Sequence, residues 1–518
     1  MWQMKILLIN QSNGVDFNQN PPLGTLYLAS SLRKAGYNVD IYDQGAKENN
    51  LRYPSKDDIK RLSPDIVGFS LYTFGLPNTL RYIKELKESF PGIRIIIGGH
   101  HATALPERTM LDCPEADFLV FGEGEITLVE LISAIESGAD ITKVNGLYFR
   151  DNGNIISTPP RPYTQNLDEL PYPANDLIQK YTYPSENITK GKKILNLTAS
   201  RGCPFSCAYC NKAVYGSTYR RRSPKNVADE IEYMINNFGY DEVMFHDELF
   251  TAKKSWMFEL FDEFRKRGLK LPWRCLGRVN TVRYEDLVAM SKNGCYIIAF
   301  GLEAGNENVR IDINRRMTNA QIKETFAAAK KAGLITYAFN MINHRLDTHD
   351  TIRDTYNLMC DVNAEFAPVF ICSPFPGSRL FQLLPEDIKY NWERFNSYRD
   401  LGAYPISICA ISEKDLMKIA DQMESFYYSR FRYLYENALI SKFSLKMKKN
   451  IFRLWLGYLL VGRLKYLTGE GFLITGDKPS SRVTKAMYKI IFKLFKGFVS
   501  LFKNKPGFKP IYKKLIRG

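Results

Sequence analysis

The sequence predicts an α/β protein in three parts: a doubly wound N-terminal domain, a partial (β/α)6 barrel and a mainly helical C-terminal region. Two series of short, β-branched apolar segments alternate with helical patterns, as buried parallel strands and their crossover helices do. Beyond about position 380 the periodicity becomes helical and rich in aromatic residues. The predicted parts are a domain over 1–140, a hairpin and linker over 141–188, the barrel over 189–380 and the helical region over 381–518.

The first series of segments forms the N-terminal domain. Strands are expected at Lys5–Asn10, Val39–Tyr42, Asp65–Ser70, Ile93–Gly98 and Asp117–Phe121, with helices such as Leu23–Ala35, Thr79–Ser89 and Ile126–Glu136 between them. A hairpin of Leu147–Arg150 and Asn154–Ser157 turns at Asp151-Asn152-Gly153. The proline-rich stretch Pro159–Pro173 is typical of a linker.

The second series of segments forms the barrel. Strands are expected at Ile194–Ala199, Glu242–His246, Trp273–Leu276, Tyr296–Gly301, Thr336–Ile342 and Val369–Ser373. The intervening helices are expected to end at Gly239, Gly268, Gly294 and Gly333. Six βα units predict a partial barrel whose chemistry lies at the carboxyl ends of its strands.

Composition excludes several classes of protein. Apolar residues make up 45% of the 518 residues and charged residues 24%, which excludes wholesale disorder and a collagen-like fibre. We find no secretory signal pattern, and the nine cysteines are odd in number, so a reducing cytosol is the expected compartment. The longest apolar run, Leu454–Val461, is shorter than the ~20 residues that a membrane-spanning helix needs.

The formal net charge of +16 is concentrated at the C-terminus. Positions 441–518 contain 19 Lys and Arg residues and two acidic residues, a net charge of +17, whereas 1–440 carry −1. Met487–Phe502 has apolar residues at a helical period and lysines on another face. Such a helix binds an anionic membrane surface or packs on its own protein with its lysines in solvent, and the sequence leaves both open. A nucleic-acid partner is not expected, because no known binding module is present and the apolar face is large.

Three cysteines, Cys203, Cys207 and Cys210, lie within eight residues directly after the first expected barrel strand. Cysteine thiolates are the usual ligands of iron–sulfur clusters, and three of them leave one iron of a cubane without a protein ligand. The alternatives are a zinc site, which prefers four ligands in two spaced pairs, and thiols without a function. No matching Cys or His pair lies nearby, so the pattern favours the cluster.

This CxxxCxxC segment resembles that of the radical S-adenosylmethionine (radical SAM) superfamily. The resemblance implies a [4Fe-4S] cluster whose open iron is chelated by S-adenosylmethionine, the cleavage of which yields a 5′-deoxyadenosyl radical. It also implies an electron donor such as flavodoxin or ferredoxin. By position in the family's motifs, the residues implied to contact S-adenosylmethionine are Tyr209, Asp247, Glu248, Arg278 and Glu303. The alternative for the three acidic residues is an ordinary solvated strand end.

The chain departs from the family pattern at the fifth barrel strand. A Gly-Leu-Pro-Gly-Glu-like turn is usual there, whereas this chain has Asn340-Met341-Ile342-Asn343-His344-Arg345. His344 and Arg345 are therefore candidates for substrate contact or proton donation, and a surface His-Arg pair is the alternative.

Three N-terminal segments resemble the Rossmann-like cobalamin-binding domain that precedes many radical SAM barrels. They are Pro21–Gly24, Gly98–Glu107 and Gly122–Glu125, and with the barrel motifs the likeness covers positions 5–380. The residues expected to meet the corrin are Ser70, Thr73, Gly98, Gly99, His100, Gly122 and Glu123. The Asp-x-His-x-x-Gly signature of a histidine lower ligand is absent, which fits base-off binding; His100 and His101 remain candidates to approach the cobalt. The rival methylthiotransferases carry three N-terminal cysteines, but residues 1–200 here contain only Cys113.

The resemblance implies a cobalamin-dependent radical SAM enzyme, and the cysteine usage makes the cytoplasm its expected location. The leading hypothesis is a methylase that transfers a methyl group from methylcobalamin to an unactivated carbon of a small-molecule or lipid-like substrate. A non-methylating enzyme, such as the cyclase of the bacteriochlorophyll fifth ring, is the first alternative, and a non-catalytic cobalamin- or lipid-binding sensor is the second. The basic tail adds peripheral attachment to the inner face of the cell membrane as a hypothesis.

Overall fold

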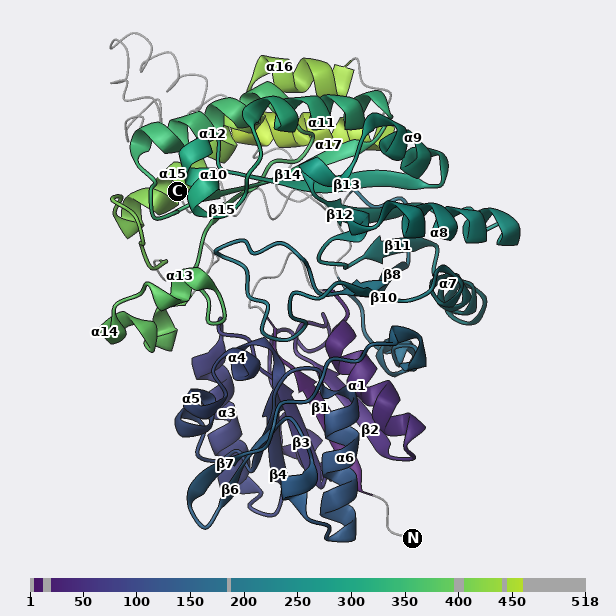
Figure 1. Ribbon diagram of the computed structural model, residues 1–518, viewed down its shortest axis with the longest axis vertical. Helices are drawn as coiled ribbons and strands as arrows, with labels where there is room; N and C mark the ends of the chain where they lie inside the picture. Colours follow the sequence, from purple (N-terminus) through teal and green to yellow (C-terminus); the bar gives the residue numbers. More distant parts are fainter. Residues whose placement is uncertain (1–3, 13–19, 184–187, 396–404, 440–444, 460–518) are drawn as a thin grey trace, which may run out of the picture. The chain divides into compact units, whose positions relative to one another are not determined.

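The computed structural model describes residues 4–12, 20–183, 188–395, 405–439 and 445–459 (Figure 1). The chain divides into two compact units. The first comprises Met1–Thr281, Lys292–Tyr296 and Ser373–Ile406, and the second comprises Val282–Ser291, Ile297–Cys372 and Ser407–Gly518. The helix expected at Met487–Phe502 lies outside the described residues.

The N-terminal part of the first unit is a seven-stranded sheet of order β2-β1-β3-β4-β5-β6-β7. Its strands are β1 (Lys5–Asn10), β2 (Asn38–Asp43), β3 (Ile66–Ser70), β4 (Arg94–Gly98), β5 (Phe118–Val120), β6 (Leu147–Asp151) and β7 (Asn154–Ser157). β1 to β5 pair in parallel, so their carboxyl ends share one edge. The five expected parallel strands are thus present, and the doubly wound fold is confirmed.

Helices cover both faces of this sheet (Figure 1). They are α1 (Leu23–Lys34), α2 (Lys56–Leu62), α3 (Leu76–Ser89), α4 (Gly99–Ala104), α5 (Pro106–Asp112) and α6 (Gly124–Ser137). On α1, Leu26, Ala29 and Leu32 recur every three residues and are fully buried against the sheet. This buried stripe fixes the helix, because burying a leucine side chain contributes roughly 1.5–3 kcal/mol.

The hairpin β6–β7 extends the N-terminal sheet. β6 pairs antiparallel with β5, with Phe118 opposite Phe149 and Val120 opposite Leu147. Leu147 is fully buried, and Phe149 is nearly so. Apolar residues alternate on the buried side of β6, which is why the hairpin completes the sheet rather than standing alone in the linker.

The first unit also holds the first half of the barrel. It consists of β8 (Ile194–Leu197), α7 (Pro224–Phe238), β11 (Glu242–Phe245), α8 (Lys254–Arg267) and β12 (Trp273–Gly277), with the short pair β9 (Ser200–Arg201) and β10 (Arg220–Arg221) and the short helices α13 (Arg379–Gln382) and α14 (Glu386–Lys389). β8, β11 and β12 pair in parallel. Phe245, Phe250 and Phe261 surround Trp273 and form the aromatic core of this half.

The second unit holds the other half of the barrel and the C-terminal helices. Its elements are α9 (Tyr284–Lys292), most of β13 (Cys295–Glu303), α10 (Glu307–Asp312), α11 (Asn319–Lys331), β14 (Ile335–Ile342), α12 (His349–Val362), β15 (Val369–Ile371), α15 (Glu413–Tyr428), α16 (Phe431–Leu434) and α17 (Leu445–Gly457). Lys292 at the end of α9 and the first two residues of β13 belong to the first unit. β13, β14 and β15 pair in parallel. The six expected barrel strands are therefore all present, and the helical C-terminal region is confirmed up to the end of α17. In the described part of the chain no helix has the length and apolarity to cross a bilayer.

Candidate functional site: a pocket at the strand ends and a cysteine loop

A pocket opens where β3 and β4 of the N-terminal sheet end. Its lining includes Ser70, Gly98, Gly99, His100, Gly122 and Glu123, which are six of the seven residues that the sequence predicts for the corrin. The seventh, Thr73, is not part of the lining; its hydroxyl is hydrogen-bonded to His101 Nδ1 at 2.9 Å. The pocket therefore lies at the edge where a doubly wound sheet binds its ligand.

Two glycines give this pocket its backbone floor. Gly99 has a φ of +91°, and a Cβ there would lie 2.8 Å from Ser70 Oγ and 2.9 Å from Leu71 N. Only glycine allows this close approach between the start of α4 and the end of β3 without strain. At Gly122, by contrast, a Cβ would meet no atom within 4 Å, so that turn leaves open space at the pocket. Bare backbone beside open space fits a large flat ring such as a corrin.

Glu123 is engaged in a buried ion-pair network. Its carboxylate accepts hydrogen bonds from Arg201 Nη1 at 3.0 Å, from Arg220 Nη1 at 2.9 Å and from the backbone N of Thr164 at 2.7 Å. Arg201 also donates to Glu125 at 2.5 Å. All four charged side chains are at most 7% exposed, so the network is shielded from water and ions. Glu123, which the sequence predicts as a corrin contact, therefore has a carboxylate whose charge Arg201 and Arg220 already compensate.

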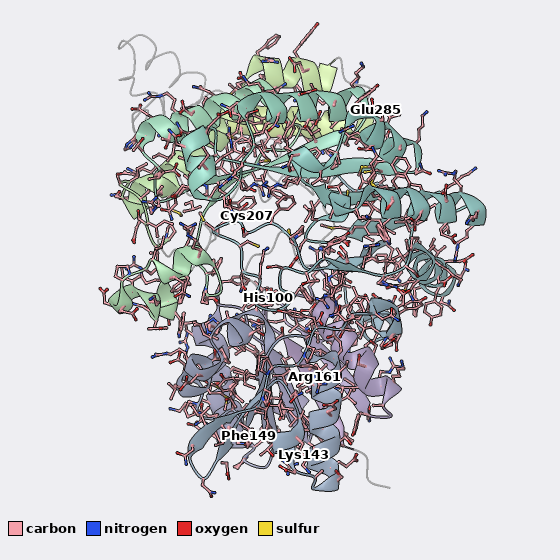
Figure 2. The ribbon with its side chains drawn as sticks, viewed as in Figure 1. His100, Lys143, Phe149, Arg161, Cys207 and Glu285 are labelled. Carbon is pink, nitrogen blue, oxygen red and sulfur yellow. The ribbon has the colours of Figure 1, made fainter. Side chains whose placement is uncertain are left out.

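The cysteine loop follows this network directly along the chain. Gly202, between Arg201 and Cys203, has a φ of +80°, and a Cβ there would lie 2.3 Å from the carbonyl O of Thr218. The loop begins against its own returning segment, because β9 and β10 pair Arg201 with Arg220. Lys212 Nζ donates to the Cys203 carbonyl at 2.6 Å and fixes the first turn. Figure 2 labels Cys207 in this loop and His100 at the pocket.

The three thiols lie near one another. Burial raises the pKa of Cys210 to about 12, and the neighbouring Glu248, Cys207 and Cys203 raise it further; burial also raises the pKa of Cys203. Within the described residues no three His, Cys, Asp or Glu side chains converge on a point that holds a single metal ion. A cubane fits the donor set nevertheless, because each cysteine binds a different iron and the three sulfurs need not converge.

Arg278 contacts the cysteine loop. Its Nη1 lies 3.6 Å from Cys207 Sγ, and its guanidinium carbon lies 3.9 Å from the centre of the Phe205 ring. The Nε donates to Asn280 Oδ1 at 3.0 Å, which orients the fork. The side chain is 5% exposed, so this positive charge acts on the cysteines in a medium of low dielectric constant.

Asp247 and Glu248, at the end of β11, occupy different environments. Asp247 is buried and accepts hydrogen bonds from the backbone N of Ala199, at 3.2 Å, and from Ser200 Oγ. Burial raises the pKa of Asp247 to about 6. Glu248 is exposed and lies close enough to Lys212 and the cysteines to interact electrostatically. The structure thus gives Asp247 a structural role at the end of β8 and leaves the Glu248 carboxylate accessible; Tyr209 is half-buried in the loop.

The remaining predicted residues belong to the second unit. Glu303 ends β13 at a bulge, has a φ of +64° and lies 3.3 Å from Arg315. His344 is fully buried, which lowers its pKa to about 4, and its backbone N donates to Asp347 Oδ2 at 2.8 Å. Arg345 is half exposed and forms an ion pair with Asp312. His344 therefore has the environment of a neutral internal group, whereas Arg345 has that of a surface ion pair.

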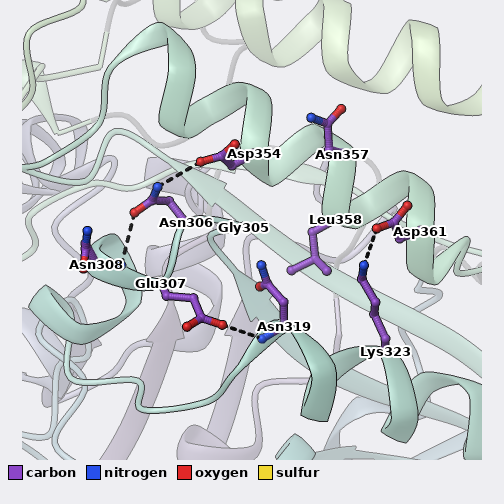
Figure 3. A pocket seen from close by; sticks show the side chains of 10 residues that line it. All are labelled: Gly305, Asn306, Glu307, Asn308, Asn319, Lys323, Asp354, Asn357, Leu358 and Asp361. Atoms are coloured by element: carbon purple, nitrogen blue, oxygen red, sulfur yellow. Dashed lines mark hydrogen bonds and ion pairs between the residues drawn. The ribbon is translucent and has the colours of Figure 1, made fainter.

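A second pocket lies in the second unit at α10, α11 and α12 (Figure 3). Its polar side chains pair with one another: Lys323 with Asp361, and Asn306 with Asp354. Glu307 accepts from the backbone N of Asn319 at 2.8 Å. Because these polar groups already bond to one another, few of them remain to bind a ligand, and we assign no function to this pocket.

Sequence reasoning missed three aromatic or charged contributors to the first site. Tyr72 and Tyr215 line the pocket, and Arg201 joins the glutamates. Tyr215 comes from the loop that carries the cysteines, which no spacing pattern reveals. A signal for Arg201 was present, since a charged residue two positions before the cysteine motif and a second acid in Gly122-Glu123-Gly124-Glu125 suggest a pair.

Two family models match the chain. The B12 binding domain matches residues 15–132, and the Radical SAM superfamily matches residues 197–359. An uncharacterised methyltransferase of Pyrococcus horikoshii is 30% identical over 403 residues, covering 76% of this chain and 86% of that protein. The anaerobic magnesium-protoporphyrin IX monomethyl ester cyclase of Rubrivivax gelatinosus is 30% identical over 408 residues, covering 76% of this chain and 72% of that protein.

A solved structure has a similar fold. It is the cobalamin-dependent S-adenosylmethionine radical enzyme OxsB, with aqua-cobalamin and S-adenosylmethionine bound. The TM-score is 0.66 at 16% sequence identity, covering 99% of this chain and 80% of that one. At this identity the likeness shows the fold.

Proposed function

Because this chain belongs to the family of cobalamin-dependent radical SAM enzymes, we propose that it is a methylase that transfers a methyl group to an unactivated carbon. The observation that carries the proposal is the shared wall of the pocket. Val214 and Tyr215, which follow Cys210 in the cysteine loop, line the same pocket as Gly98, Gly99 and Gly122. A corrin in this pocket would therefore adjoin the loop that holds the cluster, as methyl transfer to a radical requires.

The chain's own residues position the cofactors. Cys203, Cys207 and Cys210 would hold the cluster, and the backbone at Gly98, Gly99 and Gly122 would receive the corrin. When bound, these groups and S-adenosylmethionine supply a radical for hydrogen abstraction and a methyl group for transfer. The protein's part is to orient them and to exclude water from the reactive carbon.

For S-adenosylmethionine we propose Glu248 as the contact of the methionine amino group, because its carboxylate is exposed near the cysteines. Arg278 and Tyr209 would contact the cosubstrate from the same unit, and Asp247 would support the strand end behind Glu248. Glu303 is proposed for the ribose, and His344 and Arg345 are proposed for the substrate.

The proposal is tested by anaerobic reconstitution of the full chain with iron, sulfide and hydroxocobalamin. With a reductant such as flavodoxin, we expect formation of both 5′-deoxyadenosine and S-adenosylhomocysteine. Alanine at Cys203, Cys207 or Cys210 should abolish 5′-deoxyadenosine and lower bound iron. C360A is the matched control, because Cys360 lies on α12, outside the loop. Unchanged nucleoside release by the loop variants would contradict the assignment.

A non-methylating reaction is the second candidate, because the similarity to the Rubrivivax gelatinosus cyclase spans three quarters of this chain. The two candidates differ in their products. Methyl transfer yields S-adenosylhomocysteine in proportion to product, whereas cyclisation requires no methyl donor. Release of 5′-deoxyadenosine without S-adenosylhomocysteine, in the presence of substrate, would favour the cyclase-like reaction.

We further propose that the substrate is lipid-like and that the protein attaches to an anionic membrane surface. The support is the basic, amphipathic segment Met487–Phe502 in the sequence. Flotation with vesicles containing phosphatidylglycerol should recover the full chain and should lose the chain truncated after Lys478. Equal recovery of both would contradict the attachment.

A further inference from the structure

His100 is the one histidine that lines the pocket at the strand ends. It follows Gly98-Gly99 directly, where β4 ends and the backbone is bare. Building on the proposal that this pocket binds cobalamin, we propose that His100 supplies an imidazole nitrogen to the cobalt as its axial ligand on the side of the strand ends.

Two aromatic rings hold the His100 ring in place. The Tyr72 ring stacks on it at a centroid distance of 5.7 Å and an interplanar angle of 25°. The Tyr215 ring meets it edge-on, at 6.5 Å and 87°. Tyr72 follows β3 and Tyr215 lies in the cysteine loop, so His100 is oriented by two separate segments. A ligand held in this way loses little side-chain entropy when it binds a metal.

The ring nitrogens of His100 are available for a ligand. In the described parts of the chain neither nitrogen forms a hydrogen bond. The neighbouring His101 has a different environment. It is 1% exposed, its Nδ1 is hydrogen-bonded to Thr73, and its ring packs edge-on against Trp392 at 4.7 Å. Of the two adjacent histidines, one is thus used in packing and the other faces the pocket.

The other titratable side chains of the pocket are poorer donors to cobalt. Burial raises the pKa of Tyr72 and raises that of Tyr215 to about 12, so both remain neutral phenols. Glu123 and Glu125 are bound to Arg201. Burial lowers the pKa of His100, which keeps its imidazole neutral and its lone pair free, and neutral imidazole is the commonest protein ligand of metals.

The test is electron paramagnetic resonance of the full chain loaded anaerobically with cob(II)alamin. One axial nitrogen of the common isotope splits each cobalt line into three, because that nucleus has spin one. Protein grown with 15N-histidine and loaded with unlabelled cobalamin should show two lines instead, because 15N has spin one-half. The chain contains only five histidines, so the label introduces few other nitrogens. H100Q should lose the splitting, and H349Q, a change at an exposed position on α12, should keep it.

Each outcome is decisive. Splitting that stays threefold with 15N-histidine would assign the ligand to the cobalamin's own base and overturn the inference. Bound cobalamin without nitrogen splitting would overturn it too, and both results leave the proposed function intact. Failure of the wild-type chain to retain any cobalamin would overturn the proposed function itself. Bound cobalamin is quantified by absorbance in every variant, so that misfolding of H100Q is recognised; H100A then serves as the second variant.

Discussion

Arg201, two residues before the first cysteine of the motif, donates to Glu123 at 3.0 Å, and Glu123 itself lines the pocket at the strand ends. The two residues belong to different motifs, 78 positions apart. Their ion pair ties the start of the cysteine loop to the turn after β5, so the pocket and the loop are positioned together.

We expect R201A to destabilise the first unit by about 3–5 kcal/mol, because it leaves two buried carboxylates less compensated. R33A is the matched control: the Arg33–Asp176 pair is more than 40% exposed on both sides, and such pairs contribute about 0–1 kcal/mol. Urea unfolding of both variants measures the difference. Equal losses for the two would show that Arg201 has no special role.

G99A should weaken cobalamin retention and lower stability. The added methyl group would overlap Ser70 Oγ and Leu71 N in a backbone with positive φ. G138A separates the two causes, because Gly138 has a φ of +69° but no atom within 4 Å of its Cβ. The control should cost about 1–2 kcal/mol from strain alone, and G99A should cost more. Thermal unfolding measures the loss of stability in both variants, and equilibrium dialysis measures their retention of cobalamin. A larger loss in G138A than in G99A would contradict the prediction.

D247N should flatten the pH dependence of stability. Burial raises the pKa of Asp247 to about 6 from about 4 in the unfolded chain, so the folded state binds more protons in that window. As the pH rises from about 4 to about 6, ionisation of this carboxyl group therefore lowers the free energy of unfolding. The total loss is about 3 kcal/mol. Relative to wild type, D247N should gain stability across this window, as measured by unfolding at several pH values.

The matched control for this titration is D140N. Asp140 is exposed, and hydrogen bonds from Thr142 lower its pKa, so its contribution is present at neutral pH and disappears as the pH falls. Its replacement should change the profile in the opposite direction. The same profile for both variants would contradict the assignment of burial as the cause.

R278Q should lower the reduction potential of the reconstituted cluster. The guanidinium next to Cys207 Sγ stabilises the more negative, reduced form, and both charge and hydrogen bonds at the sulfurs set cluster potentials. R265Q, at an exposed residue of α8, should leave the potential unchanged. A redox titration followed by electron paramagnetic resonance measures both. An unchanged potential in R278Q would mean that Arg278 does not act on the cluster.

Much of the fold follows from local sequence. β1 spans Lys5–Asn10 as the apolar run predicts, and Gly239 and Gly268 end α7 and α8 with positive φ. These features depend on side-chain periodicity and on the conformational freedom of glycine, both of which act within a few residues. The cysteine motif likewise identifies its chemistry because its three thiols are neighbours along the chain.

The pairing of distant segments could not be predicted in this way. The hairpin β6–β7 joins the sheet through β5, Tyr215 reaches the pocket from the cysteine loop, and Arg201 meets Glu123 and Glu125. Likewise, only the tertiary structure separates His100, which lines the pocket, from His101, whose ring packs against Trp392. The sequence by itself determined the elements and the ligand types, because these depend on near neighbours. The tertiary structure decided which charges are buried together and which nitrogen is left for a ligand, because burial and pairing arise only when remote segments pack.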